Sequence, residues 1–280
     1  MDTQNLINSL NTVSEKLFKA IEGEVFTQID KLVNITSDLF KEEPLKNIFF
    51  QDKINALIVI ANSLILFYVI YFIISKIISV YNGNKSDSVY VFVIKLIIVG
   101  ALVNSSYFIC KEIINLNSLF TNCIGGFMED IIGKSINFEN LKENVLKIED
   151  LLNSDMLSLD GIIKGVISFG SISILINFSI RYVTVIFLVI ISPFAFASLS
   201  SELTLGIFKT WIKTLVVTLM TQVIVKFVIL IPMLYKDVNS MMYKVILVGS
   251  IYIIYKINNF TKEIFVRITS DMPKMNIFNS

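Results

Sequence analysis

An uncharged run from Ile54 to Ser75 is the feature that most limits what this chain can fold into. It reads INALIVIANSLILFYVIYFIIS and lies between Lys53 and Lys76. At about 1.5 Å per residue, a helix of this length covers a hydrocarbon core of roughly 30 Å. The run therefore predicts a membrane-spanning helix.

Composition extends this prediction to most of the chain. Of its 280 residues, 54% are hydrophobic and only 17% are charged, which gives a mean hydropathy of +0.72. A soluble domain of this size carries a larger charged fraction. We therefore predict an all-α fold, a polytopic transmembrane helical bundle of about five spans with amphipathic extracytoplasmic helices.

The residue types also argue against several classes of function. The chain has no histidine, the commonest general base and metal ligand, and two cysteines are too few for a thiolate metal site. It has no phosphate-binding glycine loop, and its net charge of +1 gives no general basic field for nucleic acid. We therefore expect no enzymatic activity, no catalytic residue, no cofactor and no metal.

Four further apolar segments are candidate spans. They are residues 89–110, 165–199, 213–231 and 241–259. The first of them follows a short polar turn and makes a transmembrane hairpin with the run from Ile54. The last crosses the membrane only if Lys244 and Lys256 both extend their amino groups outward.

The spans and the polar segments between them give an expected organisation of the chain. The expected parts are an N-terminal amphipathic extracytoplasmic segment (1–53), a transmembrane hairpin (54–110), an acidic amphipathic extracytoplasmic segment (111–160), a membrane core of about three spans (161–259) and a cytoplasmic tail (260–280).

Each of the two amphipathic segments carries one apolar stripe at helical spacing. The stripes are Leu6, Leu10, Val13, Leu17 and Ile21 in the first, and Phe138, Leu141, Val145, Ile148 and Leu152 in the second. Either the stripes pack against the protein's own membrane core or the lipid surface, or they bind a partner.

Charge asymmetry selects a topology. Residues 1–53 hold six lysines against nine acidic residues, and residues 111–160 hold four against nine. The basic clusters are Lys76, Lys85 and Lys95, then Lys209 and Lys213, then the four basic residues of 256–280. Residues 165–199 form either one long helix or two short ones, and only the single span puts every basic cluster on one side. We therefore expect the N-terminus outside and the C-terminus in the cytoplasm of a multi-pass cytoplasmic-membrane protein.

Two polar stripes are candidate functional features. The third span carries Gly170, Ser173, Asn177, Arg181 and Thr184, and the fourth carries Thr214, Thr218, Gln222 and Lys226. An arginine inside a span costs about 2.5–3.5 kcal/mol to insert, so Arg181 should face protein or water. The stripes either line an aqueous path or seal against each other through interhelical hydrogen bonds.

The connection between these spans carries a predicted kink and an interfacial anchor. Pro193 should kink or end the third span because it lacks a backbone N–H. Trp211, the only tryptophan, lies beside Phe208, Lys209 and Lys213, which is typical of an anchor at the lipid headgroups. Cys110 and Cys123 would both lie near the outer surface, as free thiols or as a disulfide.

The stretch from Arg181 to Pro232 resembles the polytopic inner-membrane subunit of type IV secretion systems, the TrbL-like (VirB-type) conjugal transfer family. The likeness rests on the arginine that opens an apolar run, the proline in ISPFAFA, and Phe208, Lys209 and Trp211 before the next span. It implies a multi-copy channel subunit beside scaffold proteins and cytoplasmic ATPases, with nucleic acid only as possible transported cargo.

The resulting hypothesis is a channel-forming subunit that passes DNA or protein across the cytoplasmic membrane. Its partners would be membrane lipid, further copies of the chain, the scaffold proteins and the ATPases. The alternative is a small-molecule transporter or permease subunit. A transporter usually shows a structural repeat and helices broken at matching positions, and the sequence has one such break, at Pro193.

Overall fold

The run from Ile54 lies within a single helix, α3 (Lys53–Tyr81), in the computed structural model. The structure describes residues 23–41, 53–83, 88–148 and 158–270, together with positions 9, 12, 13, 16 and 45. α3 contains no glycine or proline, and it ends before Gly83, whose φ of +67° lies in the left-handed region that glycine adopts without strain.

Every regular element in the described part of the chain is helical. Residues 23–33 form a helix, called helix 23–33 below. The elements after it are η1 (Ser37–Phe40), α3, α4 (Val89–Asn104), α5 (Ser106–Ile132), α6 (Phe138–Leu146), α8 (Leu159–Ile190), α9 (Ser192–Ala197), η2 (Ser198–Ser200), α10 (Leu205–Met233) and α11 (Met241–Ser270). The predicted all-α class is confirmed.

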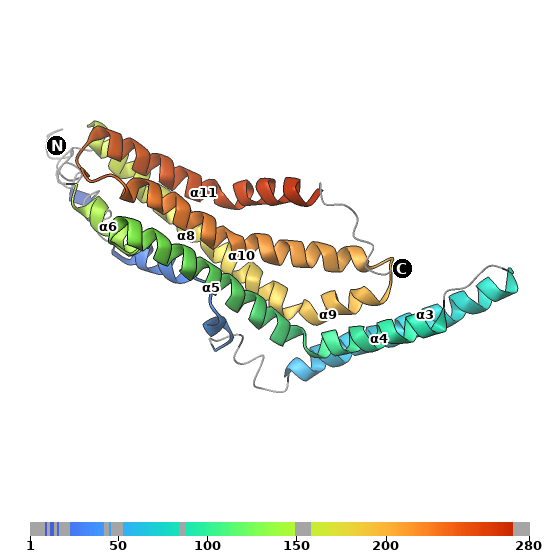
Figure 1. Cartoon of the computed structure of the whole chain (residues 1–280). Helices are drawn as coiled ribbons and strands as arrows, with labels where there is room; N and C mark the ends of the chain where they lie inside the picture. The colour runs from blue at the N-terminus through green and yellow to red at the C-terminus, as the bar shows by residue number, and fades with distance from the viewer. Residues whose placement is uncertain are drawn as a thin grey trace. The chain divides into compact units, whose positions relative to one another are not determined.

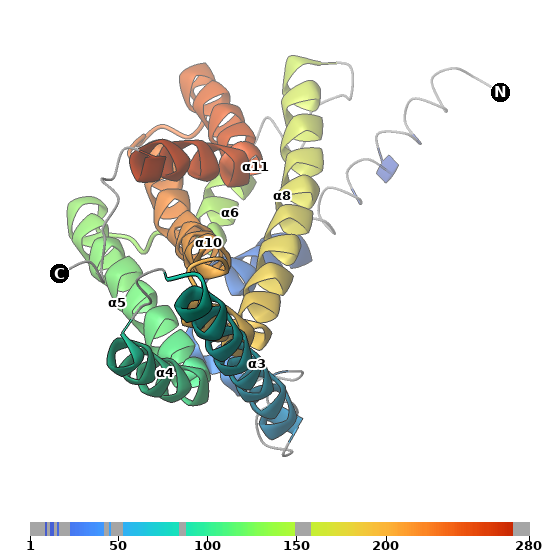
Figure 2. The ribbon, with the colours of Figure 1, turned by 90° about the vertical axis from the view of Figure 1, so that its right-hand side faces the viewer.

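The chain divides into two compact units. Unit 1 comprises residues 1–35, 118–182 and 217–280, and unit 2 comprises residues 36–117 and 183–216. The boundaries fall within α5, α8 and α10, so each of these three helices contributes to both units. The ribbon is drawn from two sides in Figure 1 and Figure 2.

Unit 1 has an apolar core made by helix 23–33, α6, α11 and parts of α5, α8 and α10. α10 and α11 lie side by side in both views (Figures 1 and 2). Three phenylalanines are buried in this core. The ring of Phe138 contacts those of Phe26 and Phe178, with centroids 6.3 and 6.4 Å away. Aromatic rings at these separations add to the stabilisation that burial gives.

The apolar stripe predicted around residue 138 belongs to this core. Phe138, Leu141, Val145 and Ile148 are each at most 1% exposed, and the first three lie on one face of α6. They pack against the protein's own interior, which is the first of the two interpretations of the stripe. Leu152 lies outside the described residues, as does the N-terminal stripe apart from Val13, which is exposed.

Unit 2 is built around the α3–α4 hairpin and the short helix α9. α9 packs against both helices of the hairpin, and α3 and α4 pack against each other. The rings of Phe72 and Phe92 stack with centroids 3.6 Å apart, and Asn62 donates a hydrogen bond to Asn104 at 3.4 Å. The predicted hairpin is therefore present, with apolar side chains exposed along much of its surface.

The second predicted span, 89–110, is broken. α4 ends at Asn104 and α5 begins at Ser106, with a bend of 66° between them. The polar residues Asn104, Ser105 and Ser106 interrupt the apolar run at this point. α5 then continues to Ile132, so the boundary expected at residue 110 falls inside a helix.

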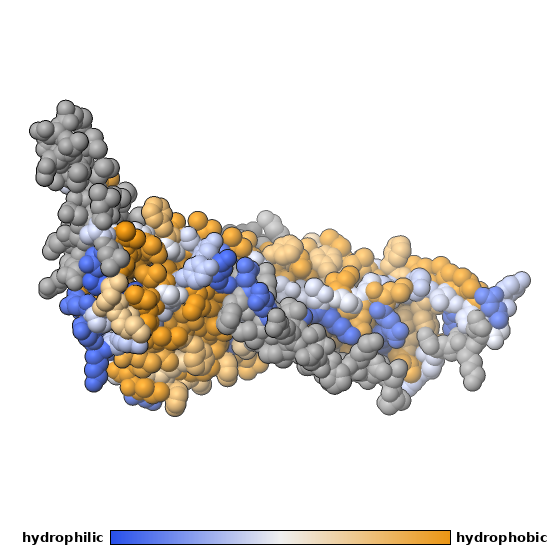
Figure 3. Space-filling model, turned by 90° about the horizontal axis from the view of Figure 1, so that it is seen from above, coloured by the Kyte–Doolittle hydropathy of each residue, from blue (hydrophilic) through white to orange (hydrophobic). Residues whose placement is uncertain are grey.

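Among the described residues, three helices are long and apolar enough to cross a membrane, or four if the bent α4–α5 pair counts as one span. The three are Ala56–Tyr81, Asp160–Ile190 and Leu205–Met233. We expected about five. The difference comes from the broken second span and from α11, which does not join this set. Apolar side chains predominate on the face of the molecule drawn in Figure 3.

Residues 165–199 contain one long helix that is not interrupted at Arg181. α8 runs without interruption to Ile190, and Pro193 occupies the first turn of α9, where its missing N–H costs no helical hydrogen bond. The helix break lies at Ile191 rather than at Arg181, and a single crossing of the membrane by residues 165–199 stays a prediction.

Lys244 does not extend outward from α11 as the fifth predicted span required. It is 4% exposed, and its Nζ lies 2.7 Å from Oδ1 of Asp160 at the start of α8. An amino group inside unit 1 is stabilised by this carboxylate, whereas it would gain nothing from the apolar side chains around it. Lys256 is exposed, as expected.

Candidate functional site

The guanidinium group of Arg181 is the centre of a polar cluster inside unit 1. The residue is 2% exposed. Its Nε donates to the carbonyl of Thr218 at 2.7 Å, and its Nη2 donates to the carbonyl of Leu219 at 3.4 Å. Both carbonyls belong to α10, so one side chain of α8 binds two successive backbone oxygens of a neighbouring helix.

Two further bonds tie Arg181 to other parts of unit 1. Nη1 donates to the carbonyl of Val33, the last residue of helix 23–33, at 3.1 Å, and Nη2 donates to Oε1 of Gln222 at 3.3 Å. The C-terminal end of a helix carries a partial negative charge, which favours a cation there. The positive charge is thus stabilised by carbonyl dipoles rather than by a carboxylate.

Gln222 extends the cluster to a fourth helix. Its Nε2 donates to Oγ1 of Thr121 in α5 at 2.9 Å, while its Oε1 accepts from Arg181. Gln222 and Thr121 are both 2% exposed. Helix 23–33, α5, α8 and α10 are therefore joined through one continuous hydrogen-bonded network.

These contacts bear on the two interpretations of the polar stripes. Where Arg181 meets α10, the stripes of α8 and α10 are joined by interhelical hydrogen bonds, as the sealing interpretation predicts. A guanidinium group has five N–H donors and no acceptor, so this group can position helices or bind an anion.

Two further members of the α8 stripe, Gly170 and Asn177, contact α11 within unit 1. Asn177 donates through Nδ2 to the carbonyl of Tyr255 at 3.0 Å. A Cβ atom on Gly170 would clash with Ile251. Ser173 donates to the carbonyl of Phe169 in its own helix at 2.9 Å. The stripe is one face of α8, but it has different neighbours at its two ends.

The outer members of both stripes belong to unit 2. Thr184 and Thr214 are half-buried there, and the hydroxyl of Thr214 donates to the carbonyl of Thr210 in its own helix at 2.8 Å. The stripes are therefore divided between the two units.

Lys226, the last member of the α10 stripe, approaches α5. A Cβ atom on Gly125 would lie 2.8 Å from its Nζ, so the glycine leaves room for the amino group. The positive charge also acts on the carboxyl group of Asp30, in helix 23–33. The α10 stripe thus brings a cation close to a carboxyl group that no sequence pattern had singled out.

Asp30 caps the start of α6. The N–H groups of Phe138 and Glu139 donate to its two carboxylate oxygens at 3.0 and 3.1 Å. Unsatisfied N–H groups at a helix N-terminus favour a negative charge. Burial nevertheless raises the pKa of Asp30 above its ordinary value of 3.8, while the two hydrogen bonds and Lys226 act in the opposite direction.

Trp211 lies in a separate aromatic cluster in unit 2. It is 3% exposed, its Nε1 donates to the carbonyl of Leu188 at 2.9 Å, and its ring lies 5.3 Å from that of Phe196 and 5.8 Å from that of Phe208. The indole N–H is thus satisfied inside the protein. Lys209 is exposed and Lys213 is half-buried, and anchoring at the headgroups stays a prediction for these two lysines.

Cys110 and Cys123 are free thiols at two positions of α5, the first buried and the second exposed. Within the described part of the chain, no group of three or more His, Cys, Asp or Glu side chains could hold a metal ion.

The fold and the cluster together define a class, an all-helical protein with several helices long and apolar enough to be embedded in a membrane. Comparisons with protein-family models, with curated proteins and with solved structures give no match for this chain.

Proposed function

We propose that this chain is a structural, channel-forming subunit of a type IV secretion or conjugation apparatus. Several copies in the cytoplasmic membrane would pass DNA or protein across it. The N-terminus would lie outside and the C-terminus in the cytoplasm. The role is structural, so the proposal includes no catalytic step and no cofactor.

The observation that carries this proposal is the uneven burial of the apolar helices. Within the most apolar window of each helix, 6% of the residues of α3 are buried, against 33% in α8 and 50% in α10. A helix that one copy leaves almost uncovered offers a large surface to lipid and to neighbouring subunits. A single chain of this size is also too small to enclose a wide conduit, so a channel would need several copies.

The segment that resembles the conjugal transfer family supports the same proposal. Arg181, Pro193 and Trp211 each have a defined place: the first holds α8 to α10, the second starts α9, and the third packs beside it. Hydrogen bonds and aromatic contacts of this kind, within each unit, suit a subunit that keeps its shape while cargo passes.

Purification of the native complex in mild detergent tests the proposal. We expect a large assembly whose mass exceeds that of the 31.8 kDa chain many times, together with a secretion ATPase or scaffold proteins. A stable monomer without partners that supports solute uptake in liposomes would refute it. Protease accessibility of tags at the two ends in intact cells tests the topology.

A transfer assay gives a second test. Replacing Arg181 with Leu should leave insertion intact and impair cargo transfer, because the network that joins four helices is lost. The control is Lys134→Leu, at an exposed position after α5. Normal transfer by the Arg181 variant would mean that the network serves stability alone.

A transporter or permease subunit is the second candidate, and Asp30 and Lys226 favour it. Lys226 lies inside a predicted span and its charge acts on the carboxyl group of Asp30, and ionisable groups within a membrane protein often mark an ion or proton path. Uptake by the purified chain in liposomes, abolished by Lys226→Met, would support this function over the first.

A further inference from the structure

Two amphipathic helices of unit 1 reach the middle of α8. The carbonyl of Val33, the last residue of helix 23–33, accepts from Arg181 at 3.1 Å. The ring of Phe138, the first residue of α6, lies 6.4 Å from that of Phe178. One end of each helix therefore lies at the level of Phe178 and Arg181.

That level lies within the hydrocarbon of any membrane that α8 crosses. A core of roughly 30 Å takes up about 20 helical residues. Asp160–Ile190 has 31 residues, so a stretch of about 20 placed anywhere along it includes Phe178. Lys164 is the last charged residue before Arg181. If the core begins after Lys164, Phe178 lies about 9 Å or more from either edge.

α10 gives the same depth. Gln222, which accepts from Arg181 at 3.3 Å, lies within any stretch of about 20 residues placed along Leu205–Met233, a helix of 29 residues. The two apolar helices thus independently place the surroundings of Arg181 inside the membrane.

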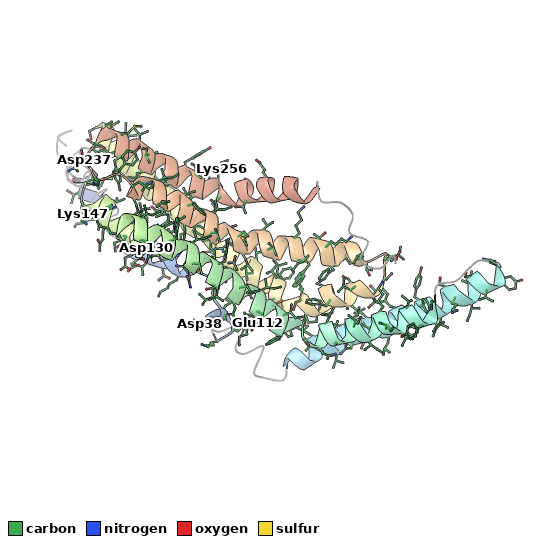
Figure 4. All side chains as sticks on the ribbon, viewed as in Figure 1. Asp38, Glu112, Asp130, Lys147, Asp237 and Lys256 are labelled. Atoms are coloured by element: carbon green, nitrogen blue, oxygen red, sulfur yellow. The ribbon has the colours of Figure 1, made fainter. Side chains whose placement is uncertain are left out.

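Helix 23–33 and α6 are antiparallel neighbours that extend from this level to one end of unit 1. Nζ of Lys142 donates to the carbonyl of Gly23 at 3.4 Å. Figure 4 shows Lys147, directly after α6, at the same end of the ribbon as Asp237, which lies in the connection between α10 and α11. Each helix therefore has one end deep in the membrane and the other toward its surface.

The exposed side chains that these two helices carry are all polar, whereas those of α8 are apolar. The polar ones are Glu24, Thr27, Gln28 and Lys31 on helix 23–33, and Glu139 and Glu143 on α6. The exposed side chains described on α8 within unit 1 are Ile162, Val166, Phe169, Ile176 and Ile180. Unit 1 thus has two kinds of surface at one depth.

The backbone that follows Val33 is also polar and uncovered. Asn34 is exposed, and neither it nor Ile35 is helical. Non-helical backbone at membrane depth occurs only where protein covers it or where it lines a water-filled cavity, because lipid offers it no hydrogen bonds. This chain leaves Asn34 uncovered, which favours water at this position.

Lipid and a closely packed partner both fit this surface poorly. Lipid would leave the charges of Lys31 and Glu139 without partners, and the side chain of Glu139 is too short to reach the headgroups from beside Phe138. A protein interface has apolar or aromatic anchors at its centre, and none is among the exposed side chains of helix 23–33 and α6.

We infer that the exposed face of helix 23–33 and α6 borders a water-filled cavity that enters the membrane as far as Lys31 and Glu139. The cavity is open toward the end of unit 1 at which α6 ends, because Glu24 and Glu143 continue the polar surface in that direction. In an assembly of several copies this face points to the conduit and the apolar face of α8 points to lipid. The inference rests on the membrane-spanning part of the proposed function and not on the apparatus or the cargo.

Cysteine accessibility tests the inference. Cys110 and Cys123 are first replaced with Ala, and Lys31→Cys or Glu139→Cys then introduces a single thiol deep on the polar face. Membrane vesicles from cells that express the full chain are opened by freezing and thawing. A charged maleimide that does not cross lipid then reaches both membrane faces.

Matched controls lie at the same depth on the apolar face of α8. They are Ile176→Cys and Ile180→Cys, both at exposed positions. We expect the thiols at positions 31 and 139 to react at least about tenfold faster than these controls, because a thiol reacts as the thiolate, which forms in water and not in hydrocarbon. Equal rates at all four positions would overturn the inference.

Two further measurements interpret slow labelling. Lys147→Cys, at an exposed position just after α6, shows that the reagent reaches this end of unit 1, and labelling after denaturation in SDS gives the amount of each variant present. If positions 31 and 139 react only after detergent dissolves the membrane, lipid or another protein covers the face and the water-filled cavity is refuted. A chain that purifies as a monomer refutes the multi-copy channel instead, whatever the labelling at these positions.

Discussion

Replacing Arg181 with Lys should destabilise the protein more than replacing it with Met. The guanidinium donates in three directions, to α10, to Val33 and to Gln222. A lysine keeps the positive charge, but its single amino group on a differently shaped side chain cannot reproduce this planar fork. The charge would then remain inside the bundle with incomplete partners, which is the costly arrangement.

The magnitudes support this order. Each hydrogen bond to a charged group contributes about 1.5–3 kcal/mol, so a lysine that loses one or two of them costs about 1.5–6 kcal/mol. Methionine loses all four bonds but also removes a charge whose insertion costs about 2.5–3.5 kcal/mol. The carbonyls of Thr218 and Leu219 lie inside α10, and that of Val33 also accepts from Ile35, so Oε1 of Gln222 is the main group left unsatisfied, at about 1–3 kcal/mol.

Thermal unfolding in detergent, followed by tryptophan fluorescence, measures the order. We expect wild type, then Arg181→Met, then Arg181→Lys in decreasing midpoint. Lys134→Met, at an exposed position, should unfold with the wild type. A lysine variant as stable as the wild type would show that water completes the coordination of the charge, and the reasoning from a dry network would fail.

Three further changes probe other contacts. Asp160→Asn should cost more stability than the double change with Lys244→Met, because the single change leaves the buried amino group without its carboxylate; unfolding midpoints in a double-mutant cycle measure this. Gly170→Val should separate α8 from α11 and lower the midpoint, whereas Gly165→Val should be tolerated in open space. Asp30 has a raised pKa, so its protonation favours the folded state: relative to Asp30→Asn, the wild type should lose stability as the pH rises from about 3.8 through the folded pKa, and parallel pH profiles of the two would contradict this.

The parts of the fold that follow from the sequence are those governed by local pattern. The long uncharged run predicted α3, and the three- and four-residue spacing of apolar residues from Phe138 predicted the buried face of α6. The break at Ser105 was present in the sequence as three successive polar residues, yet hydropathy averaged over a span conceals so short an interruption. The charge contrast near residue 110 did not mark a helix boundary, because charged side chains on an exposed face do not end a helix.

The partners of the site could not be predicted in the same way. The bond from Arg181 to Val33 joins residues 148 positions apart, and that from Gln222 to Thr121 joins residues 101 apart. Spacing along one helix identifies which residues share a face but not which backbone carbonyl meets that face. Asp30 carried no distinguishing signal, since its role depends on the start of a helix more than a hundred residues away.

The Arg181 network also limits where cargo could pass if the proposed function is correct. A route through the interior of unit 1 would have to separate α8 from α10 and from helix 23–33, and so break several charge-assisted hydrogen bonds at once. A route between copies would leave this network intact and would use the surfaces that a single chain leaves uncovered, such as that of α3. The second route requires no rearrangement of the core, so we expect crosslinks between copies through α3 to alter transfer while crosslinks within unit 1, between α8 and α10, leave it unchanged.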